Sequence, residues 1–205
     1  MSKLFDTEKV YVHIMHGDVT TMNLSRNSNV ISKIGDDIRS YAKSYHFTKK
    51  DFKEIIHIVD MDGAFIPDKN IIEDRNLESV IYSETQIKTK CKENIEKRNT
   101  QKRNNLNKLY SRKEIWDVPY RVFYMSCNLD HVLYNKMNSS DEDKKNDSYM
   151  FAKKYKLIPN EFLKFISESD FSVTSGYKES WEYIKQDLHS LERHTNLGIC
   201  FDDNQ

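Results

Sequence analysis

The stretch "IIHIVDMDGAFIPD", residues 55–68, constrains the fold of this chain more than any other part of its sequence. The run from Ile55 to Asp60 is mostly apolar and β-branched, which predicts a strand, and Gly63 predicts a turn directly after it. Asp60 and Asp62 therefore stand two residues apart where a strand ends. Two such carboxylates can reach one cation, because hard ions such as Mg²⁺ and Mn²⁺ prefer oxygen ligands. The plainer interpretation is a turn whose aspartates accept hydrogen bonds from backbone amides.

The segments before this strand predict a β-α-β unit. The sequence "VYVHIM" (10–15) is β-branched and aromatic, which is typical of a strand, and turn residues follow it. From Asn29 to about Tyr45, apolar residues recur every three or four positions, which predicts an amphipathic helix. Two strands joined by such a helix are normally parallel. Since ligands of open α/β sheets bind beyond the carboxyl ends of the strands, Asp60 and Asp62 are expected to face a binding crevice.

The rest of the chain predicts one more long strand and a helical C-terminal part. Residues 118–125 are rich in strand-forming residues, and a short apolar segment (129–134) follows them after a turn. The later elements are expected in this order: helices at 148–156 and 160–167, a helix containing Trp181, Ile184, Leu188 and Leu191, and a final strand within 195–205. We therefore expect a single α/β domain over residues 1–205, with a mainly parallel sheet.

A basic stretch, residues 84–114, interrupts this pattern. Between Lys88 and Lys113 there are ten Lys or Arg residues against two Glu, and apolar positions are few. We expect a solvated, partly helical insertion there. A charged surface helix is the plain interpretation, and a basic arm that contacts the phosphate backbone of nucleic acid is the sharper one. The residues expected to bind nucleic acid are Lys88, Lys90, Lys97, Arg98, Lys102 and Arg103.

Composition narrows the class of protein. Lys+Arg and Asp+Glu both number 32, so the net charge of zero gives no sign of a polyanionic partner. Cys91, Cys127 and Cys200 stand singly, which favours a reducing cytoplasm and argues against structural zinc. With only 5 Gly and no Gly-rich phosphate loop, the chain does not resemble P-loop or Rossmann proteins. No apolar run approaches the roughly 18 residues of a membrane helix, so we expect a soluble, cytoplasmic protein.

Further acidic residues could complete a metal site with Asp60 and Asp62. The first predicted strand runs into His16 and Asp18, and the third runs into a turn followed by Asp130. If these strands are neighbours, the four aspartates gather around one Mg²⁺ or Mn²⁺ ion, which could orient water and stabilise charge on a phosphoryl group. The catalytic residues expected from this arrangement are Asp60, Asp62 and His16, with His16 as a general base or a ligand.

The order of strand, acid, helix, strand and D-x-D resembles the Toprim fold of topoisomerases, primases and overcoming-lysogenization-defect (OLD) nucleases. Within that fold the chain is most similar to the small RloB/AbiL-type proteins of bacterial phage-defence loci. The elements that carry the resemblance are His16-Gly17-Asp18, Asp60-Met61-Asp62, residues 126–135 and residues 193–201. It implies a metal-dependent nuclease that cuts DNA or RNA in antiphage defence by abortive infection.

The same resemblance implies partners and one alternative. Proteins of this kind often work with a separate ATPase subunit, so nucleic acid, an ATPase and a second copy of this chain are the expected partners. The family carries Glu at the position of His16. The alternative is therefore a catalytically degenerate regulatory or sensor subunit that works with the partner ATPase.

A second resemblance is to the haloacid dehalogenase (HAD) superfamily, whose first motif looks like "VDMDGAFIPD". It implies a phosphatase in which Asp60 is the nucleophile that forms an aspartyl-phosphate and Asp62 is the general acid. Ser126, Lys178 and the pair Asp202-Asp203 would then supply the remaining motifs. In that superfamily the motif normally lies on the first strand, whereas here a strand and a helix are predicted before it.

Overall fold

The computed structural model describes residues 10–15, 17–22 and 29–202. In this part of the chain the α-helices are α1 (Val30–Ser44), α2 (Lys92–Tyr110), α3 (Leu129–Tyr134), α4 (Asp141–Tyr155), α5 (Pro159–Ser167) and α6 (Tyr177–Ile184). The strands are β1 (Ile55–Asp60), β2 (Ile71–Glu73), β3 (Ile81–Tyr82), β4 (Ile87–Thr89), β5 (Glu114–Ile115), β6 (Val118–Ser126) and β7 (His194–Thr195). Short 3₁₀ helices are η1 (Lys49–Asp51), η2 (Asp68–Asn70) and η3 (Leu197–Phe201).

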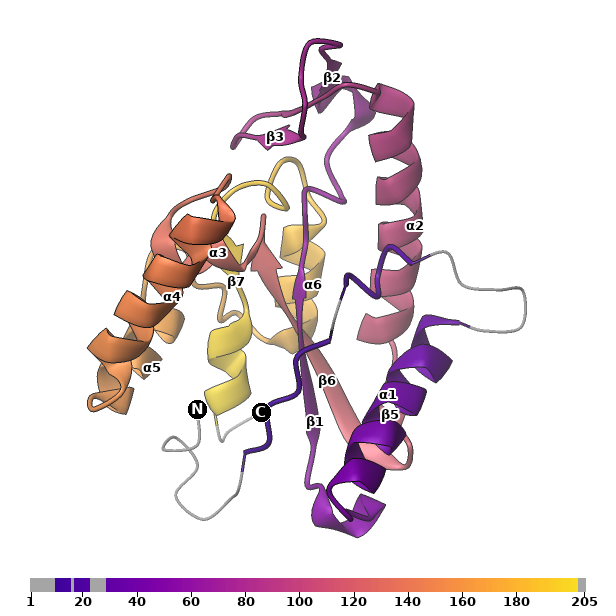
Figure 1. Cartoon of the computed structure of the whole chain (residues 1–205), viewed down its shortest axis with the longest axis vertical. Coiled ribbons are helices and arrows are strands. Elements are labelled where there is room, and N and C mark those ends of the chain that lie inside the picture. Colours follow the sequence, from indigo (N-terminus) through magenta and orange to yellow (C-terminus); the bar gives the residue numbers. More distant parts are fainter. Residues whose placement is uncertain (1–9, 16, 23–28, 203–205) are drawn as a thin grey trace.

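The main sheet is built around β6. Strand β1 pairs with β6 in parallel, from Ile55 opposite Tyr120 to Asp60 opposite Met125, whereas β5 and β7 pair with β6 in an antiparallel direction. The fold is therefore α/β, but the main sheet is mixed rather than mainly parallel. A second small sheet, in the order β2-β4-β3, lies beyond the carboxyl end of β1 (Figure 1).

Helices cover both faces of the main sheet (Figure 1). Side chains of β6 alternate between these faces, as the two-residue period of a strand requires. Tyr120, Val122 and Tyr124 join a core with α1, α2 and α6, while Phe123 and Met125 join a second core with α3, α5 and η3. This burial on both faces explains why the β6 sequence is almost continuously apolar.

The first predicted strand is not formed. Residues 10–15 belong to no strand, and Tyr11, Val12 and Ile14 are exposed. The ring of Tyr11 lies 4.5 Å from that of Phe47, just beyond the end of α1, and the ring of His13 lies near α1 as well. The aromatic residues of this segment thus pack against the α1 region instead of entering a ladder. The prediction of a β-α-β unit is therefore wrong for its first strand, whereas the predicted helix α1 and strands β1 and β6 are confirmed.

The basic stretch is not a solvated insertion. Most of it is α2, which packs along the main sheet and buries Ile95, Leu106 and Leu109 as well as polar residues. Because these positions recur at steps of three and four, they form one inward face. The predicted helical character is confirmed, and the predicted solvation is wrong for that face.

The C-terminal helices follow the prediction with shifted bounds. Helix α4 begins earlier than expected, because Ser140 caps it and accepts a hydrogen bond from Asp143 N (3.1 Å). Helix α6 ends at Ile184, before Leu188 and Leu191. The expected final strand is limited to β7, and η3 follows it. Within the described ranges, no helix is both long and apolar enough to cross a membrane.

Candidate functional site

The site begins where β1 ends. Asp60 is the last residue of β1, and the backbone then stays bonded to the end of β6. Met61 N donates to Met125 O (2.9 Å), and Asp62 N donates to Cys127 O (2.6 Å). These bonds continue the contact between the two strands, so Asp60 and Asp62 both stand at the carboxyl edge of the main sheet.

A tight turn follows, and its geometry depends on glycine. Asp62 and Gly63 both have a positive φ, +49° and +65°. Gly63 N donates to Ser190 O (3.0 Å), which ties the turn to the loop after α6. A Cβ at Gly63 would lie 2.7 Å from Leu191 Cδ2, well inside van der Waals contact. Both the left-handed backbone and the close packing therefore require glycine here.

Lys102 of α2 binds two carboxylates of the site. Its side chain is fully buried, and Nζ donates to Asp18 Oδ2 (2.7 Å) and to Asp62 Oδ2. Burial alone would lower the pKa of Lys102, but Asp62 and Asp18 outweigh it and the pKa is raised. A fully buried ammonium group is tolerated only with such compensation, so the three side chains form one electrostatic unit.

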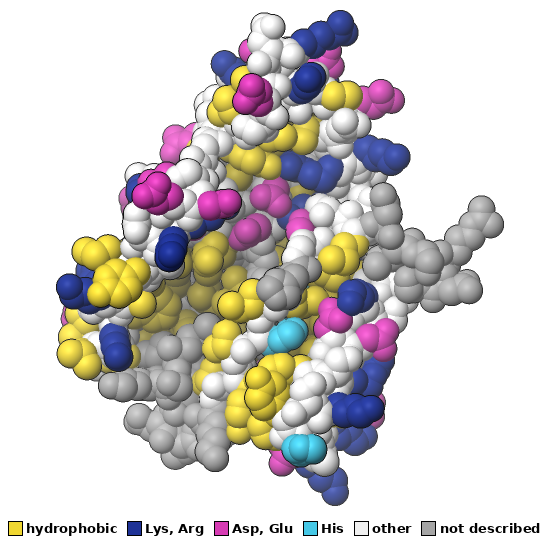
Figure 2. Space-filling view, in the orientation of Figure 1, with side chains coloured by type: hydrophobic (Ala, Val, Ile, Leu, Met, Phe, Trp, Pro, Cys, Tyr) yellow, Lys and Arg dark blue, Asp and Glu magenta, His cyan; other side chains and the backbone are white. Residues whose placement is uncertain are grey.

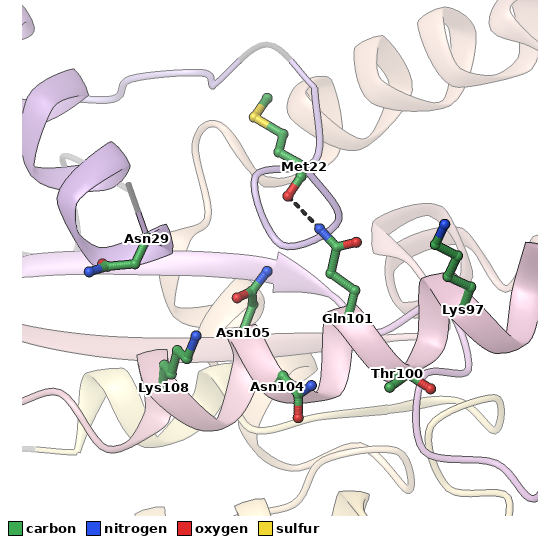
Figure 3. A pocket seen from close by; sticks show the side chains of 8 residues that line it. All are labelled: Met22, Asn29, Lys97, Thr100, Gln101, Asn104, Asn105 and Lys108. Atoms are coloured by element: carbon green, nitrogen blue, oxygen red, sulfur yellow. Dashed lines mark hydrogen bonds between the residues drawn. The ribbon is translucent and has the colours of Figure 1, made fainter. Parts of the chain in front are cut away.

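The loop 17–22 reaches this unit because α2 holds its backbone. Gln101 Nε2 donates to Thr21 O (3.1 Å) and to Met22 O, and Asn105 Nδ2 donates to Thr20 O (2.8 Å), as the close view of α2 shows for Met22 (Figure 3). Within the loop, Thr20 N donates to Asp18 Oδ1 (2.9 Å). Burial raises the pKa of Asp18, but Lys102 and Thr20 outweigh it, and the pKa is lowered.

Asp60 differs from the other two aspartates in its electrostatics. Its Oδ1 accepts a hydrogen bond from Leu129 N (2.9 Å), at the start of α3. The residue is solvent-accessible, yet many protein atoms surround its carboxyl group. This burial, together with the charge of Asp62, raises the pKa of Asp60 to about 7, against the opposing effect of Lys102. Asp60 can therefore gain or lose a proton near neutral pH.

Asp60→Asn is expected to stabilise the protein, and increasingly so as the pH rises from about 4 to about 7. A carboxyl group whose pKa is raised by folding costs stability above its unfolded pKa, and that cost is complete above its folded pKa. Because water screens this accessible group, we expect a gain of only ~1 kcal/mol at pH 8 and almost none at pH 4. Urea unfolding of both proteins at the two pH values measures it. An equal difference at both would contradict the raised pKa.

Asp130 is not brought to the other aspartates. It lies in the first turn of α3, where burial raises its pKa, and the charged groups that influence it are Lys144, Asp147 and Lys136. Neither Asp60 nor Asp62 is among them. The predicted four-aspartate cluster therefore lacks Asp130, because the helical turn directs this residue toward α4. His16, the predicted base, lies outside the described residues.

The residues predicted to bind nucleic acid divide into two sets. Lys88, Lys90 and Lys97 are exposed. The other three form hydrogen bonds within the protein. Lys102 binds Asp18 and Asp62 as described. Arg98 donates to Asp62 O (2.7 Å) and to Tyr82 Oη (2.6 Å), and Arg103 donates to Ala64 O (3.2 Å). Arg98 and Arg103 thus support the backbone of the site turn, and the prediction for Lys102 is corrected, since its ammonium group is buried.

The HAD motifs are only partly assembled. Ser126 is adjacent to Asp60 through the parallel β1–β6 pairing, but its Oγ donates to His189 O (2.8 Å). Lys178 follows Tyr177, which is bonded to Val122 in the middle of β6. Asp202 follows η3, whose Cys200 is close enough to Arg121 near the start of β6 to affect its pKa. These contacts are to the middle and the start of β6 rather than to its carboxyl end, and Asp203 lies outside the described residues.

Sequence reasoning named Lys102 as a nucleic-acid contact and missed its role as the buried partner of the site aspartates. A signal was present: Ile95, Asn99, Lys102, Leu106 and Leu109 follow each other at steps of four, three, four and three. A lysine at a position of this apolar spacing points inward, and an inward lysine needs an acidic partner. The surrounding basic run concealed this pattern.

The donor set of the site fits a small divalent cation in part. Among the described residues, no group of three or more His, Cys, Asp or Glu side chains is arranged to hold a metal ion. Lys102 Nζ contacts both Asp18 and Asp62 in this arrangement. In the same part of the chain, Asp60 Oδ2 and Asp62 Oδ1 have no hydrogen-bond partner. Two carboxylate oxygens suffice for Mg²⁺, which is usually held by one or two carboxylates and several waters.

One face of the molecule is hollowed, and acidic side chains lie in the hollow. Figure 2 shows a hollow near the centre of this face, beneath the small β2-β4-β3 sheet, with acidic side chains gathered in it. A reciprocal pair of hydrogen bonds joins β3 to the residues after α3, Tyr82 N to Asn138 Oδ1 (2.9 Å) and Asn138 Nδ2 to Tyr82 O (2.8 Å). The small sheet is thereby attached to the α3–α4 connection.

Comparison with known proteins adds no relative. No family model matches the chain, and no curated protein or solved structure is significantly similar to it. The chemistry of this protein is therefore inferred from its own residues.

Proposed function

We propose that the protein is a divalent-cation-dependent hydrolase of phosphodiester bonds in nucleic acid. The observation that carries this proposal is the convergence of Asp18 and Asp62 on one buried ammonium group beside Asp60. Such a concentration of charge at the carboxyl edge of a sheet costs stability, and sites of this kind are usually retained for binding or catalysis.

The charge balance of the site supports a cation. Three carboxylates, Asp18, Asp60 and Asp62, share the single ammonium group of Lys102. Burial of the carboxyl group is the main reason why the pKa of Asp60 is raised to about 7, and the negative charges of Asp62 and Asp18 raise it further. A divalent cation beside Asp60 would offset the repulsion and release the Asp60 proton.

Each residue has a distinct expected role. Asp60 and Asp62 are the residues that would hold the cation, and Lys102 orients Asp62 and Asp18. When bound, the cation would stabilise negative charge on the phosphoryl group and lower the pKa of an attacking water. Leu129 N–H fixes one oxygen of Asp60, and the other has no hydrogen-bond partner among the described residues.

Cleavage assays test the proposal. Plasmid DNA, single-stranded DNA and total tRNA are incubated with the protein in Mg²⁺ or Mn²⁺ and in EDTA. We expect cleavage only with the cation, and Asp62→Asn should lower its rate by about 100-fold or more, since a lost ligand removes several kcal/mol of transition-state stabilisation. Asp68→Asn, an exposed aspartate shortly after the same turn, is the matched control and should cleave normally.

Titration of Mn²⁺ by calorimetry separates the remaining outcomes. Binding that is lost in Asp60→Asn and Asp62→Asn but kept in Asp68→Asn supports a cation site, even where the cleaved substrate has yet to be found. Wild-type protein that binds Mn²⁺ no better than these variants would contradict the proposal. It would favour the degenerate regulatory or sensor subunit that works with an ATPase.

A phosphatase with Asp60 as nucleophile is the second candidate. The observation that favours it is the parallel β1–β6 pairing, in which Asp60 lies opposite Met125 and Ser126 follows at the same carboxyl edge of the sheet. This candidate predicts turnover of p-nitrophenyl phosphate and tight binding of beryllium fluoride at Asp60, and the nuclease predicts neither. The Toprim relationship, the antiphage setting and a cytoplasmic location stay predictions from the sequence.

A further inference from the structure

A polar trough runs along α2, next to the loop that carries Asp18. Figure 3 shows side chains that line it from α2, from the loop at Met22 and from Asn29 before α1. A cavity of about 500 Å³ is lined by Met22, Asn29, Lys97, Thr100, Gln101, Asn104, Asn105 and Lys108. A second cavity of about 390 Å³ shares Asn29 and Lys108 with it and adds Ile31, Ser32 and Arg112. We call the two together the α2 trough.

The α2 trough carries positive charge without compensation from its own walls. Among the described residues that line it, Lys97, Lys108 and Arg112 are charged and none is Asp or Glu. In the described ranges neither Lys97 nor Lys108 forms an ion pair, whereas Lys92 of the same helix pairs with Glu96 (3.7 Å). For a chain whose net charge is zero, this is a local concentration of cationic and amide donors suited to an anion.

The N-terminus of α1 adds to the positive charge that acts on the α2 trough. Asn29 caps α1 by accepting a hydrogen bond from Ser32 N (3.0 Å), and both residues line the trough. No acidic residue lies in the first turn of α1. The partial positive charge at the N-terminus of this helix therefore acts on the same space as Lys108.

The spacing of the lining residues indicates a linear ligand. Lys97, Gln101, Asn104 and Lys108 lie on one face of α2, and at 1.5 Å per residue the two lysines are about 16 Å apart along the helix axis. A single phosphate group cannot contact both. A chain of phosphodiesters can, and Lys, Asn and Gln side chains are common donors to its oxygens. One helix face offers a single row of hydrogen-bond donors, which suits one strand of nucleic acid.

The trough and the acidic site share one loop. Gln101 and Asn105 line the trough and also hold the carbonyl oxygens of Thr20, Thr21 and Met22. Asp18 of this loop is bonded to Lys102, which follows Gln101 directly. A strand lying in the trough would thus run beside the segment that completes the carboxylate cluster.

We infer that the α2 trough binds the backbone of single-stranded nucleic acid, and, resting on the proposed function, that this strand is the substrate. Lys97 and Lys108 contact phosphates at the two ends of the trough. Gln101 and Asn104 lie between them.

Binding is measured without cleavage, so that this inference and the nuclease proposal can fail separately. Fluorescence anisotropy in EDTA follows labelled RNA and DNA single strands of about 20 nucleotides. The double variant Lys97→Ala/Lys108→Ala should bind both about tenfold more weakly. The slope of log K against log salt concentration should become shallower by about 1.4, since each phosphate contact on a single strand contributes about 0.7. Affinity for RNA alone would support the inference equally and indicate a contribution of the 2′-hydroxyl.

The matched control is Lys153→Ala/Lys156→Ala, which removes the same charge from exposed positions at the end of α4. It should bind as the wild type does. Equal weakening in both double variants, or inorganic polyphosphate competing as well as the oligonucleotides, would overturn the inference. Normal binding by the trough variant would overturn it as well, even if the wild type cleaves nucleic acid. Selective loss of binding in the trough variant supports it even if no cleavage occurs.

Discussion

Lys102→Met is expected to lower the free energy of unfolding by about 3 kcal/mol at pH 7. Methionine preserves most of the buried volume, so the loss comes from the carboxylates of Asp18 and Asp62, which no longer have a counter-charge. Breaking a buried ion pair from one side usually costs ~3–5 kcal/mol, and we take the lower value because these carboxylates are 38% and 23% exposed. Urea unfolding at pH 7 measures the effect, and Lys97→Met, an exposed lysine of the same helix, should change stability by less than ~0.5 kcal/mol.

The pH dependence of this loss identifies its cause. The pKa of Asp18 is lowered in the folded protein, so the stability it contributes is present above its unfolded pKa near 4 and is lost as the pH falls through its folded pKa. The difference between wild type and Lys102→Met should therefore shrink at pH 3. Adding Asp18→Asn and Asp62→Asn to Lys102→Met should restore part of the stability at pH 7. A loss that stays constant with pH and is not recovered would point to a packing defect instead.

Gly63→Ala is expected to cost about 2–5 kcal/mol, made up of ~1–2 kcal/mol for the left-handed backbone and ~1–3 kcal/mol for overpacking. The added Cβ would lie 2.7 Å from Leu191 Cδ2 and 3.0 Å from Ile87 Cδ1, both in a well-packed core. Gly17→Ala is the matched control, because Gly17 also has a positive φ (+82°) but its nearest neighbour is the flexible end of Met22 at 3.3 Å. It should cost only ~1 kcal/mol.

A double-mutant cycle with Leu191→Ala separates the two contributions. In that background Gly63→Ala loses its main clash, so its cost should fall to the ~1–2 kcal/mol of backbone strain. Additive effects would show that the close approach of Leu191 is not the cause. Because Asp62 precedes Gly63, we also expect Gly63→Ala to weaken Mn²⁺ binding.

The parts of this fold that could be predicted are those with a strong local period. Three elements could be predicted because each carries a clear pattern of apolar residues. They are the strand ending at Asp60, the strand 118–125 and the helix after Asn29. Residues 10–15 have the composition of a strand, yet they contact Phe47 and α1 instead. The composition of this segment gives it a propensity to form a strand, but tertiary contacts determine the conformation that it adopts.

The position of the candidate site could be predicted from the sequence, but the full set of residues that form it could not. Asp60 and Asp62 were identified from the strand end that carries them. Asp18 joins them only through Lys102, a contact between residues far apart in the chain that no local pattern expresses. Asp130 directly follows Leu129, whose N–H donates to Asp60, but the first turn of α3 directs the Asp130 side chain toward α4. A local pattern therefore located the site, and only long-range contacts determined which charges it contains.

The pairing of β6 has a consequence for how the chain assembles during synthesis. The hydrogen bond between His57 and Tyr120 spans 63 residues, and the one from Tyr124 to Asn196 spans 72. Closing such long loops precedes the gain from their contacts, which slows folding relative to helical proteins of similar length. On the ribosome β6 can pair with β1 early, but it must wait for β7, whose Thr195 pairs with Met125 from 70 residues further along the chain. During that interval one edge of the central strand is open to non-native pairing.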